Sequence, residues 1–392
     1  MALSKSELEG ENLRAALMQI ELRQRMMSKL PRFCGTKGIW FGSRLATEQC
    51  SSERCAEYKK KIIGRRCKKG VDLTGGMGVD TLFLAEMCDE MTYVERDFGL
   101  CEAARHNFGL MAGNVEVVNM EAEEWLEMCA RDRETGHAPS LQDRYGFGFV
   151  DPARRGERGE KVFRIGDCTP DVRGLRGKLL ERCERVIVKL SPMLDVKECI
   201  EELRPFMVVI VSVENECKEV IAVMDGRDGE RDGAGSVCTV RAVELRKNGE
   251  EVVMDFRYSE EERSETGFAE RIEEGMMIYE PWAAMMKSGA WNTMAERYGV
   301  RMVAGNSHLY VGEEGEFPGR GFRIVEVREF GKREAERMLK GKANVAVRNF
   351  PMSVAEVRKR FKCKEGGERY VFLTTDKNGK RLIIEGRRIE YK

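Results

Sequence analysis

Apolar residues in the first two thirds of the chain form short runs that alternate with longer amphipathic segments. Helical spacing over Leu13–Leu30 ends at Pro31, and a second helix is expected from the capping hydroxyls of Ser51 and Ser52 to Gly64. The segments that follow alternate regularly. They predict strands at 71–74, 91–95, 115–118, 148–150, 185–190 and 207–213, and helices at 80–87, 100–110, 121–130, 173–183 and 195–203. Such alternation is typical of a doubly wound, mostly parallel α/β sheet.

The pattern changes after the sixth predicted strand. Apolar runs at Val237–Leu245 and Glu251–Arg257 predict a hairpin, whose first arm we expect to be the antiparallel strand that closes the large sheet. A helix is expected from Glu280-Pro281 to about Tyr298. A β-α-β-α-β-β order then follows, with elements at 322–327, 331–340, 343–347, 353–361, 370–374 and 381–385. We therefore expect a helical region at 1–66, an α/β domain at 67–258, a linking, ferredoxin-like segment at 259–320 and a small α/β module at 321–392.

Composition is typical of a soluble protein with more than one domain. The chain has 392 residues, of which 42% are hydrophobic and 34% are charged. No apolar run of about 18 residues appears, so no membrane span is expected, and the first residues do not resemble a signal segment. None of the 13 cysteines forms a C-x-x-C pair and only three histidines occur. We therefore expect reduced thiols, a cytoplasmic protein and no metal site.

The net charge of zero hides an uneven distribution. Residues Gly319–Lys392 contain 21 Lys and Arg against 10 Asp and Glu, so this part carries an excess of 11 positive charges. A basic module on an otherwise acidic chain favours an anionic partner, of which nucleic acid is the commonest. The expected phosphate contacts are Arg348, Arg358, Lys359, Arg360, Lys362 and Lys364, on or beside one helix. The alternative is that these side chains only solvate the surface of a small domain.

A glycine-rich turn carries the clearest chemical signal. The run Val71-Asp-Leu-Thr-Gly-Gly-Met-Gly78 follows an apolar strand, and Glu95 ends the next strand. Glycines let the backbone approach a ligand closely. A carboxylate at the end of the second strand can accept hydrogen bonds from ribose hydroxyls. The glycines run G-G-x-G, whereas a dinucleotide site has G-x-G-x-x-G, so a nucleoside cofactor other than NAD is favoured.

A second candidate site follows the strand at 148–150, in the sequence Asp151-Pro-Ala-Arg-Arg155. Ligands of open α/β sheets bind outside the carboxyl ends of the strands, so Asp151 and Pro152 are expected beside the glycine turn. We predict that Asp151 orients an acceptor or takes up its proton; the alternative is an acid that caps a turn. Lys189, at the end of the next strand, is expected to meet a carboxylate or a phosphate, because burying it unpaired is costly. Arg154 and Arg155 suit a phosphate backbone.

These motifs resemble those of bacterial class I S-adenosylmethionine (SAM)-dependent methyltransferases with a C-terminal THUMP-like domain. The resemblance covers roughly residues 30–390 and rests also on the runs Gln49–Ser52, Lys189–Met193, Glu216–Glu219, Tyr279–Pro281 and Arg348–Pro351. It implies a Rossmann-like methyltransferase sheet, SAM as the cofactor, and RNA, from the THUMP-like part, as the partner. The implied cofactor-binding residues are Asp72, Thr74, Gly75, Gly76, Gly78, Asp80, Glu95, Arg96, Glu121 and Ala122, with Gln49, Ser51, Ser52 and Tyr58 as further candidates.

The chain departs from the amino-methylating families in one motif. Ala153 replaces a second proline, and Arg154 stands where an aromatic residue would stack on the base. Uridine-carbon methylation would need a nucleophilic cysteine. The nearest candidate is Cys168, whose acidic neighbour Asp167 disfavours the thiolate. We therefore predict methylation of a base in structured RNA, either tRNA or rRNA. The alternatives are a non-catalytic or differently specific RNA-binding protein and an NAD-dependent oxidoreductase.

Overall fold

The computed structural model describes residues 10–134, 144–153, 164–225, 238–265 and 267–389. The chain divides into two compact units. The first contains Met1–Val209 and Lys218–Ala234, and the second contains Ile210–Cys217 and Gly235–Lys392. No helix in the described ranges is both long enough and apolar enough to cross a membrane.

Among the described residues, four helices precede the first strand, as the helical spacing predicts for two of them. Ser43 and Ser52 cap α3 and α4 by accepting hydrogen bonds from Ala46 N and Cys55 N, and Gly64 ends α4 with a φ of 81°. α1 ends at Met26, before the predicted end at Leu30, and Pro31 begins the short helix α2. The bounds are α1 Gly10–Met26, α2 Pro31–Gly35, α3 Arg44–Gln49 and α4 Glu53–Ile63.

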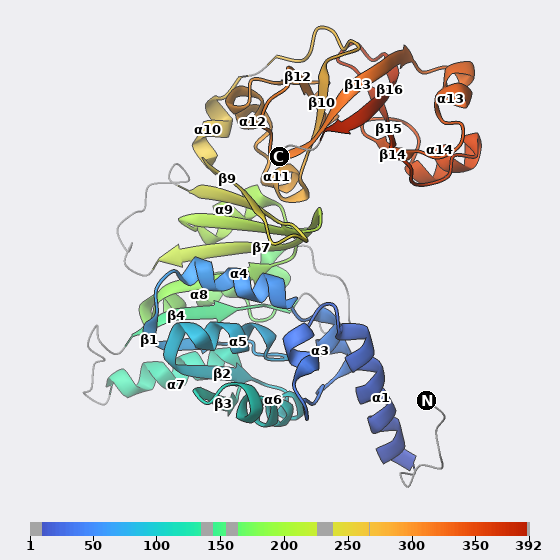
Figure 1. Ribbon diagram of the computed structural model, residues 1–392. Helices are drawn as coiled ribbons and strands as arrows, with labels where there is room; N and C mark the ends of the chain where they lie inside the picture. Colours follow the sequence, from blue (N-terminus) through green and yellow to red (C-terminus); the bar gives the residue numbers. More distant parts are fainter. Residues whose placement is uncertain (1–9, 135–143, 154–163, 226–237, 266, 390–392) are drawn as a thin grey trace. The chain divides into compact units, whose positions relative to one another are not determined.

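The first unit is built around a mostly parallel sheet (Figure 1). Seven strands of this nine-stranded sheet lie in the order β3-β2-β1-β4-β5-β7-β6, and β3, β2, β1, β4 and β5 pair in parallel. The strands are β1 Cys67–Asp72, β2 Cys88–Glu95, β3 Val115–Asn119, β4 Tyr145–Val150, β5 Cys183–Leu190, β6 Met207–Val213 and β7 Glu216–Asp225. The helices between them are α5 Val79–Leu84, α6 Phe98–Met111, α7 Ala122–Glu134, α8 Val172–Arg182 and α9 Val196–Leu203, with 3₁₀ turns at Ala85–Met87 and Ile165–Asp167. The predicted doubly wound fold is confirmed.

The strand that runs antiparallel to β5 is β7, whereas the hairpin arm that we expect to close the large sheet, β8 Thr239–Leu245, joins that sheet next to β6. The physical reason lies in the turn after β6. Glu214 and Asn215 both have positive φ, at 52° and 63°, which reverses the chain within two residues and sends it straight back. The polar start of β7, Glu216-Cys-Lys-Glu219, hides this strand from the hydrophobic pattern.

The second unit contains the predicted hairpin and the predicted β-α-β-α-β-β module. The hairpin is β8 Thr239–Leu245 with β9 Glu251–Arg257. A seven-stranded sheet has the order β11-β12-β10-β13-β16-β15-β14. Its strands are β10 Met277–Pro281, β11 Arg301–Met302, β12 Tyr310–Gly312, β13 Gly319–Glu329, β14 Asn344–Val347, β15 Arg369–Thr375 and β16 Arg381–Ile389. The helices are α10 Tyr258–Arg263, α11 Ala283–Ser288, α12 Trp291–Arg297, α13 Lys332–Met338 and α14 Val354–Phe361.

One helix prediction for the second unit needs correction. Glu280 and Pro281 end strand β10 and do not open a helix, and the predicted helix to Tyr298 is divided into α11 and α12 around Gly289. The strand is buried at all five positions and pairs with β12 and β13. Tertiary pairing therefore prevails over the helix-opening signal of the Glu-Pro dipeptide.

Candidate functional site

The strand order reverses between β1 and β4, and the candidate residues meet at the carboxyl ends of these strands. The turn Thr74–Gly78 joins β1 to α5. Gly76 and Gly78 have φ values of 53° and 75°, which side chains rarely adopt. A Cβ on Gly75 would lie 2.0 Å from the Tyr93 ring. This turn therefore requires its glycines for conformation and for close packing.

Glu95 faces the glycine turn from the end of β2. Its Oε2 accepts a hydrogen bond from Gly76 N at 2.9 Å, and its Oε1 accepts one from Asp97 N at 2.9 Å. Each carboxylate oxygen can accept more than one hydrogen bond, so Glu95 can hold the turn and still bind hydroxyl groups. The structure thus brings together the turn and the acid that the sequence pairs.

Asp151 follows β4 on the other side of β1. Its backbone N–H donates to Thr74 Oγ1 at 2.6 Å, which ties the two strand ends together. Its carboxylate forms an ion pair with Lys189 of β5. Burial raises the pKa of Asp151 above its ordinary value, although the Lys189 ammonium acts in the opposite direction. The pKa of Lys189 is also raised, because Asp151 and Asp80 outweigh the effect of burial. The sequence predicts that Lys189 contacts either a carboxylate or a phosphate, and in the structure it contacts a carboxylate.

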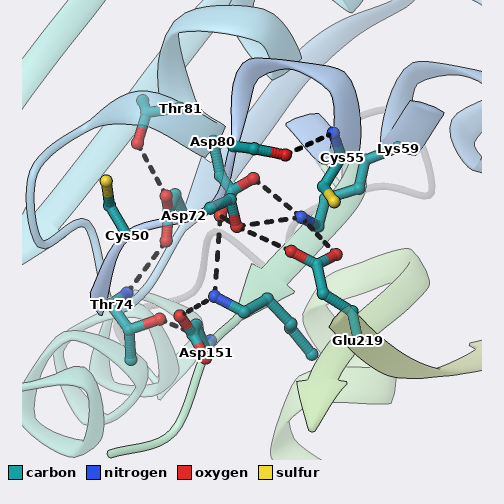
Figure 2. Close-up of polar contacts among 12 residues, drawn as sticks. Cys50, Cys55, Lys59, Asp72, Thr74, Asp80, Thr81, Asp151 and Glu219 are labelled. Atoms are coloured by element: carbon teal, nitrogen blue, oxygen red, sulfur yellow. Dashed lines mark hydrogen bonds and ion pairs between the residues drawn. The ribbon is translucent and has the colours of Figure 1, made fainter. Parts of the chain in front are cut away.

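Two other predicted cofactor residues, Asp72 and Asp80, are buried and already engaged (Figure 2). Asp72 accepts hydrogen bonds from Thr74 N at 3.0 Å and from the Thr81 hydroxyl at 2.6 Å. Burial raises its pKa to about 7. Asp80 pairs with Lys59 at 2.9 Å. Burial alone would raise the pKa of Asp80, but the ammonium of Lys59 lowers it below the ordinary value. Both carboxylates therefore hold the protein groups around the cavity in place.

These groups line one cavity of about 1010 Å³ in the first unit, at the upper end of the usual range for ligand pockets. It contains every predicted cofactor-binding residue: Asp72, Thr74, Gly75, Gly76, Gly78, Asp80, Glu95, Arg96, Glu121 and Ala122. It also contains Asp151, Pro152 and Gln49. Further lining residues that the sequence pattern does not single out include Leu45, Ala46, Glu48 and Met120.

The predicted residues outside this lining have different surroundings. Ser52 is the cap of α4, and Tyr58 is buried on the same helix. Cys168 donates its thiol to Arg164 O at 3.6 Å, while its neighbours Thr169 and Pro170 reach the cavity. Arg154 and Arg155 lie outside the described residues.

Lys59 is the residue that the sequence pattern missed. It belongs to the run Lys59-Lys60-Lys61, which reads as a basic helix end, yet it is fully buried and pairs with Asp80 and with Glu219. Its spacing from the buried residues Ala56 and Ile63, at three and four positions, is the signal that could have identified it.

The predicted RNA-contacting residues of the second unit fall into two groups. Arg348 pairs with buried Glu280 at 2.8 Å, and Arg358 pairs with Glu365 at 2.9 Å. Lys359 and Arg360 are exposed in the last turn of α14. Among the residues the structure describes, no three His, Cys, Asp or Glu side chains are grouped as a metal ion would need.

Comparison with known proteins bears on both units. A family model described as THUMP domain-like matches residues 319–388, and a ferredoxin-like domain model matches residues 278–318. A protein from Porphyromonas gingivalis W83 described as a methyltransferase is 32% identical, and its crystal structure matches at a TM-score of 0.85 over 99% of this chain and 93% of that chain.

Other solved structures match part of the chain. A SAM-dependent methyltransferase from Agrobacterium tumefaciens is 18% identical over 45% of this chain and 63% of its own, at a TM-score of 0.33. A protein from Streptococcus mutans described as a SAM-dependent methyltransferase is 15% identical over 43% of this chain and 41% of its own, at a TM-score of 0.32. No curated protein matches the chain significantly.

The raised pKa of Asp72 predicts a pH-dependent effect of the Asp72→Asn substitution. Between the ordinary value of 3.8 and about 7, the unfolded chain loses this proton while the folded protein keeps it. Ionisation of Asp72 therefore destabilises the fold as the pH rises through this range, by about 1.4 kcal/mol per pKa unit at most. Asparagine carries no such charge and can still bond to Thr74 N and Thr81.

Thermal unfolding without added ligand at pH 5 and pH 8 tests this expectation. The melting temperature of Asp72→Asn relative to the parent protein should rise with pH. The exposed variant Asp89→Asn, on β2, controls for the loss of a carboxylate. A relative melting temperature for Asp72→Asn that falls with pH, or that follows the control, would contradict the assignment.

Proposed function

Because the chain belongs to the family of SAM-dependent methyltransferases that carry a C-terminal THUMP-like domain, we propose that it methylates a base in structured RNA. The observation that carries the proposal is the meeting of the glycine turn and the carboxylates of Glu95 and Asp151 at one cavity. The glycine turn and Glu95 form its cofactor part, and Asp151 with Pro152 forms its acceptor part.

The residues of the cofactor part fit SAM. A side chain at Gly75 would clash with Tyr93, and Glu95 can accept hydrogen bonds from two ribose hydroxyls. The carboxylates that line the cavity favour a cationic ligand, and Glu121 and Ala122 lie where the family resemblance implies an adenine contact. SAM supplies a methyl group that is already activated on sulfonium. The protein then has to align the acceptor and exclude water.

Asp151 is the residue we assign to the acceptor. A carboxylate that ends β4 beside Thr74 can accept a hydrogen bond from an amine and take up its proton. Its raised pKa brings it closer to the range in which such a base works at neutral pH. Lys189 fixes the direction of the carboxylate through their ion pair. Cys168 is not among the described residues that line the cavity, which favours this route over a covalent one.

The second unit supplies the RNA-binding surface in this proposal. Lys340 and Lys342 follow α13, and Lys362 and Lys364 follow α14; all four are exposed. Lys342 and Lys364 are paired in a β-bridge, so the two basic loops lie side by side. Lys359 and Arg360 extend this basic surface along α14. The ion pairs of Arg348 and Arg358 favour a smaller contribution from those two residues.

The cofactor assignment predicts weaker binding after Glu95→Gln. Glutamine keeps an acceptor for the glycine turn but removes the charge, and each charge-assisted hydrogen bond contributes about 1.5–3 kcal/mol. Calorimetry with S-adenosylhomocysteine should therefore show a loss of roughly tenfold or more in affinity. Glu90→Gln, at an exposed position of the same strand, is the control. Equal affinity of the Glu95 variant and the parent protein would refute the ribose contact.

The catalytic assignment predicts that Asp151→Asn slows methyl transfer by about 10²–10⁴-fold while the affinity for SAM changes little. Transfer of labelled methyl groups from SAM to total RNA of a strain that lacks the gene is the measurement. Cys168→Ser should leave the rate nearly unchanged. An essential Cys168 with a dispensable Asp151 would show that the reaction class is wrong.

The RNA assignment predicts binding that weakens steeply with salt, because each neutralised phosphate releases counterion. Replacing Lys342, Lys359 and Lys364 together with glutamine should lower the slope of log affinity against log salt by about 2–3. Lys380→Gln controls for the loss of an exposed lysine that pairs with Glu329. Titration of tRNA and rRNA fragments in filter binding provides the data. If the triple substitution leaves the slope of log affinity against log salt unchanged, the RNA does not bind at these three lysines.

A further inference from the structure

Lys59 carries a buried charge that the chemistry described so far does not use. It lies on α4, is 0% exposed and is not part of the cavity lining. Its ammonium lies 2.9 Å from Asp80 Oδ1 and 2.7 Å from Glu219 Oε2, and it donates to Ser51 Oγ at 3.1 Å. Burial works against the charge, but Asp80 and Glu219 raise the pKa of Lys59 above its ordinary value. Lys59 thus donates hydrogen bonds to Asp80 and Ser51 and forms an ion pair with Glu219 (Figure 2).

The cluster has more carboxylates than ammonium groups. Lys59 and Lys189 face three acids: Asp80 and Glu219, which are almost fully buried, and Asp151, whose side chain is 32% exposed. Lys59 holds Asp80 and Glu219, while Lys189 pairs with Asp151 and stays 3.9 Å from Asp80 Oδ2. Because Lys59 pairs with Asp80 and Glu219, Lys189 is left to pair with Asp151.

The sheet geometry allows Lys189 to replace Lys59 as the cation beside Asp80 and Glu219. Lys189 is opposite Ile221 in the β5–β7 pairing. Side chains two residues apart on a strand point to the same face, so Glu219 shares a face with Lys189. Without Lys59, the buried carboxylates of Asp80 and Glu219 would lose their nearest cation, and Lys189, which is already 3.9 Å from Asp80 Oδ2, would be the replacement. A flexible four-carbon side chain can make this movement.

A second contact links Lys59 to the acceptor part of the cavity. Its ammonium lies 5.8 Å from the centre of the Phe149 ring, and Phe149 precedes Asp151 by two residues on β4. Phe149 also lines the cavity. Lys59 therefore contacts β4, the strand that precedes Asp151. It also contacts Asp80 and Glu219, the two acids that would otherwise attract Lys189.

We propose that Lys59 is a positioning residue of the methyl-transfer site, which occupies Asp80 and Glu219 and so leaves Lys189 to orient Asp151. This inference rests on the role proposed above for Asp151. Lys59 does not touch the acceptor; it acts through the choice of partner made by Lys189. The cluster then works as one unit, in which a residue of α4 sets the ionisation and direction of a carboxylate on β4.

Lys59→Met tests the inference in the full-length protein. Methionine retains most of the side-chain length without the charge. With Lys189 drawn towards Asp80 and Glu219, the carboxylate of Asp151 loses its cation, and its pKa rises further. The negative charges of the surrounding acids also raise the pKa of Asp151; these acids are Asp72, Asp80 and Glu219. The acidic limb of the pH–rate profile, measured by methyl transfer to total RNA, should move to higher pH, and the rate at pH 7 should fall by tenfold or more.

Lys60→Met is the matched control, because Lys60 lies on the same helix but pairs with Glu57 and Glu86. Its pH–rate profile should equal that of the parent protein. Lys59→Arg should restore much of the rate, because it restores the charge. If Lys59→Met does not fold, Lys59→Gln replaces it, with the same expected movement of the profile.

A second readout needs no RNA. In protein labelled with ¹⁵N-lysine, the buried ammonium groups of Lys59 and Lys189 should give protected signals, assigned by Lys59→Met and Lys189→Met. The Lys189 signal should move in Lys59→Met or Lys59→Gln and stay in place in Lys60→Met. An unmoved Lys189 signal or an unmoved pH–rate profile would overturn the positioning role. If Asp151→Asn leaves methyl transfer intact, the proposed role of Asp151 fails instead, whatever Lys59 does.

Discussion

The candidate site depends on the ion pairs that are buried beneath its cavity. Leaving one buried charge without a partner costs about 3–5 kcal/mol, a large part of the stability of an ordinary domain. Lys59, Asp80, Glu219 and Lys189 come from α4, α5, β7 and β5, and the contact between Ser51 and Glu219 spans 168 positions of the sequence. These elements therefore have to assemble together, and the assembled cluster holds the strand ends that carry the chemistry.

Above the buried cluster, the ends of three strands line the cavity. Thr74 connects the ends of β1 and β4 through its hydrogen bond with Asp151 N, and Glu95 connects the end of β2 to the glycine turn. The three strand ends are thus fixed before any ligand binds. Preorganisation of this kind lets binding energy serve the alignment of cofactor and acceptor.

Much of this arrangement could be predicted from the sequence, because parallel strands bring their carboxyl ends to one edge. Thr74, Glu95 and Asp151 each follow an apolar run, and the rule for open α/β sheets places them together. β7 escaped the pattern because its first residues are polar. Lys59 escaped it because three consecutive lysines look alike in sequence, and only the spacing from the buried positions of α4 distinguishes it from the other two. Such long-range pairings have no local signal.

The central proposal is that this protein methylates a base in RNA. Mass spectrometry of nucleosides from total RNA, compared between a strain with the gene and a strain without it, tests that claim most directly. We expect one methylated nucleoside to disappear with the gene and to return when the gene is restored. Identical nucleoside profiles in the two strains, under conditions where the protein is produced, would contradict the claim.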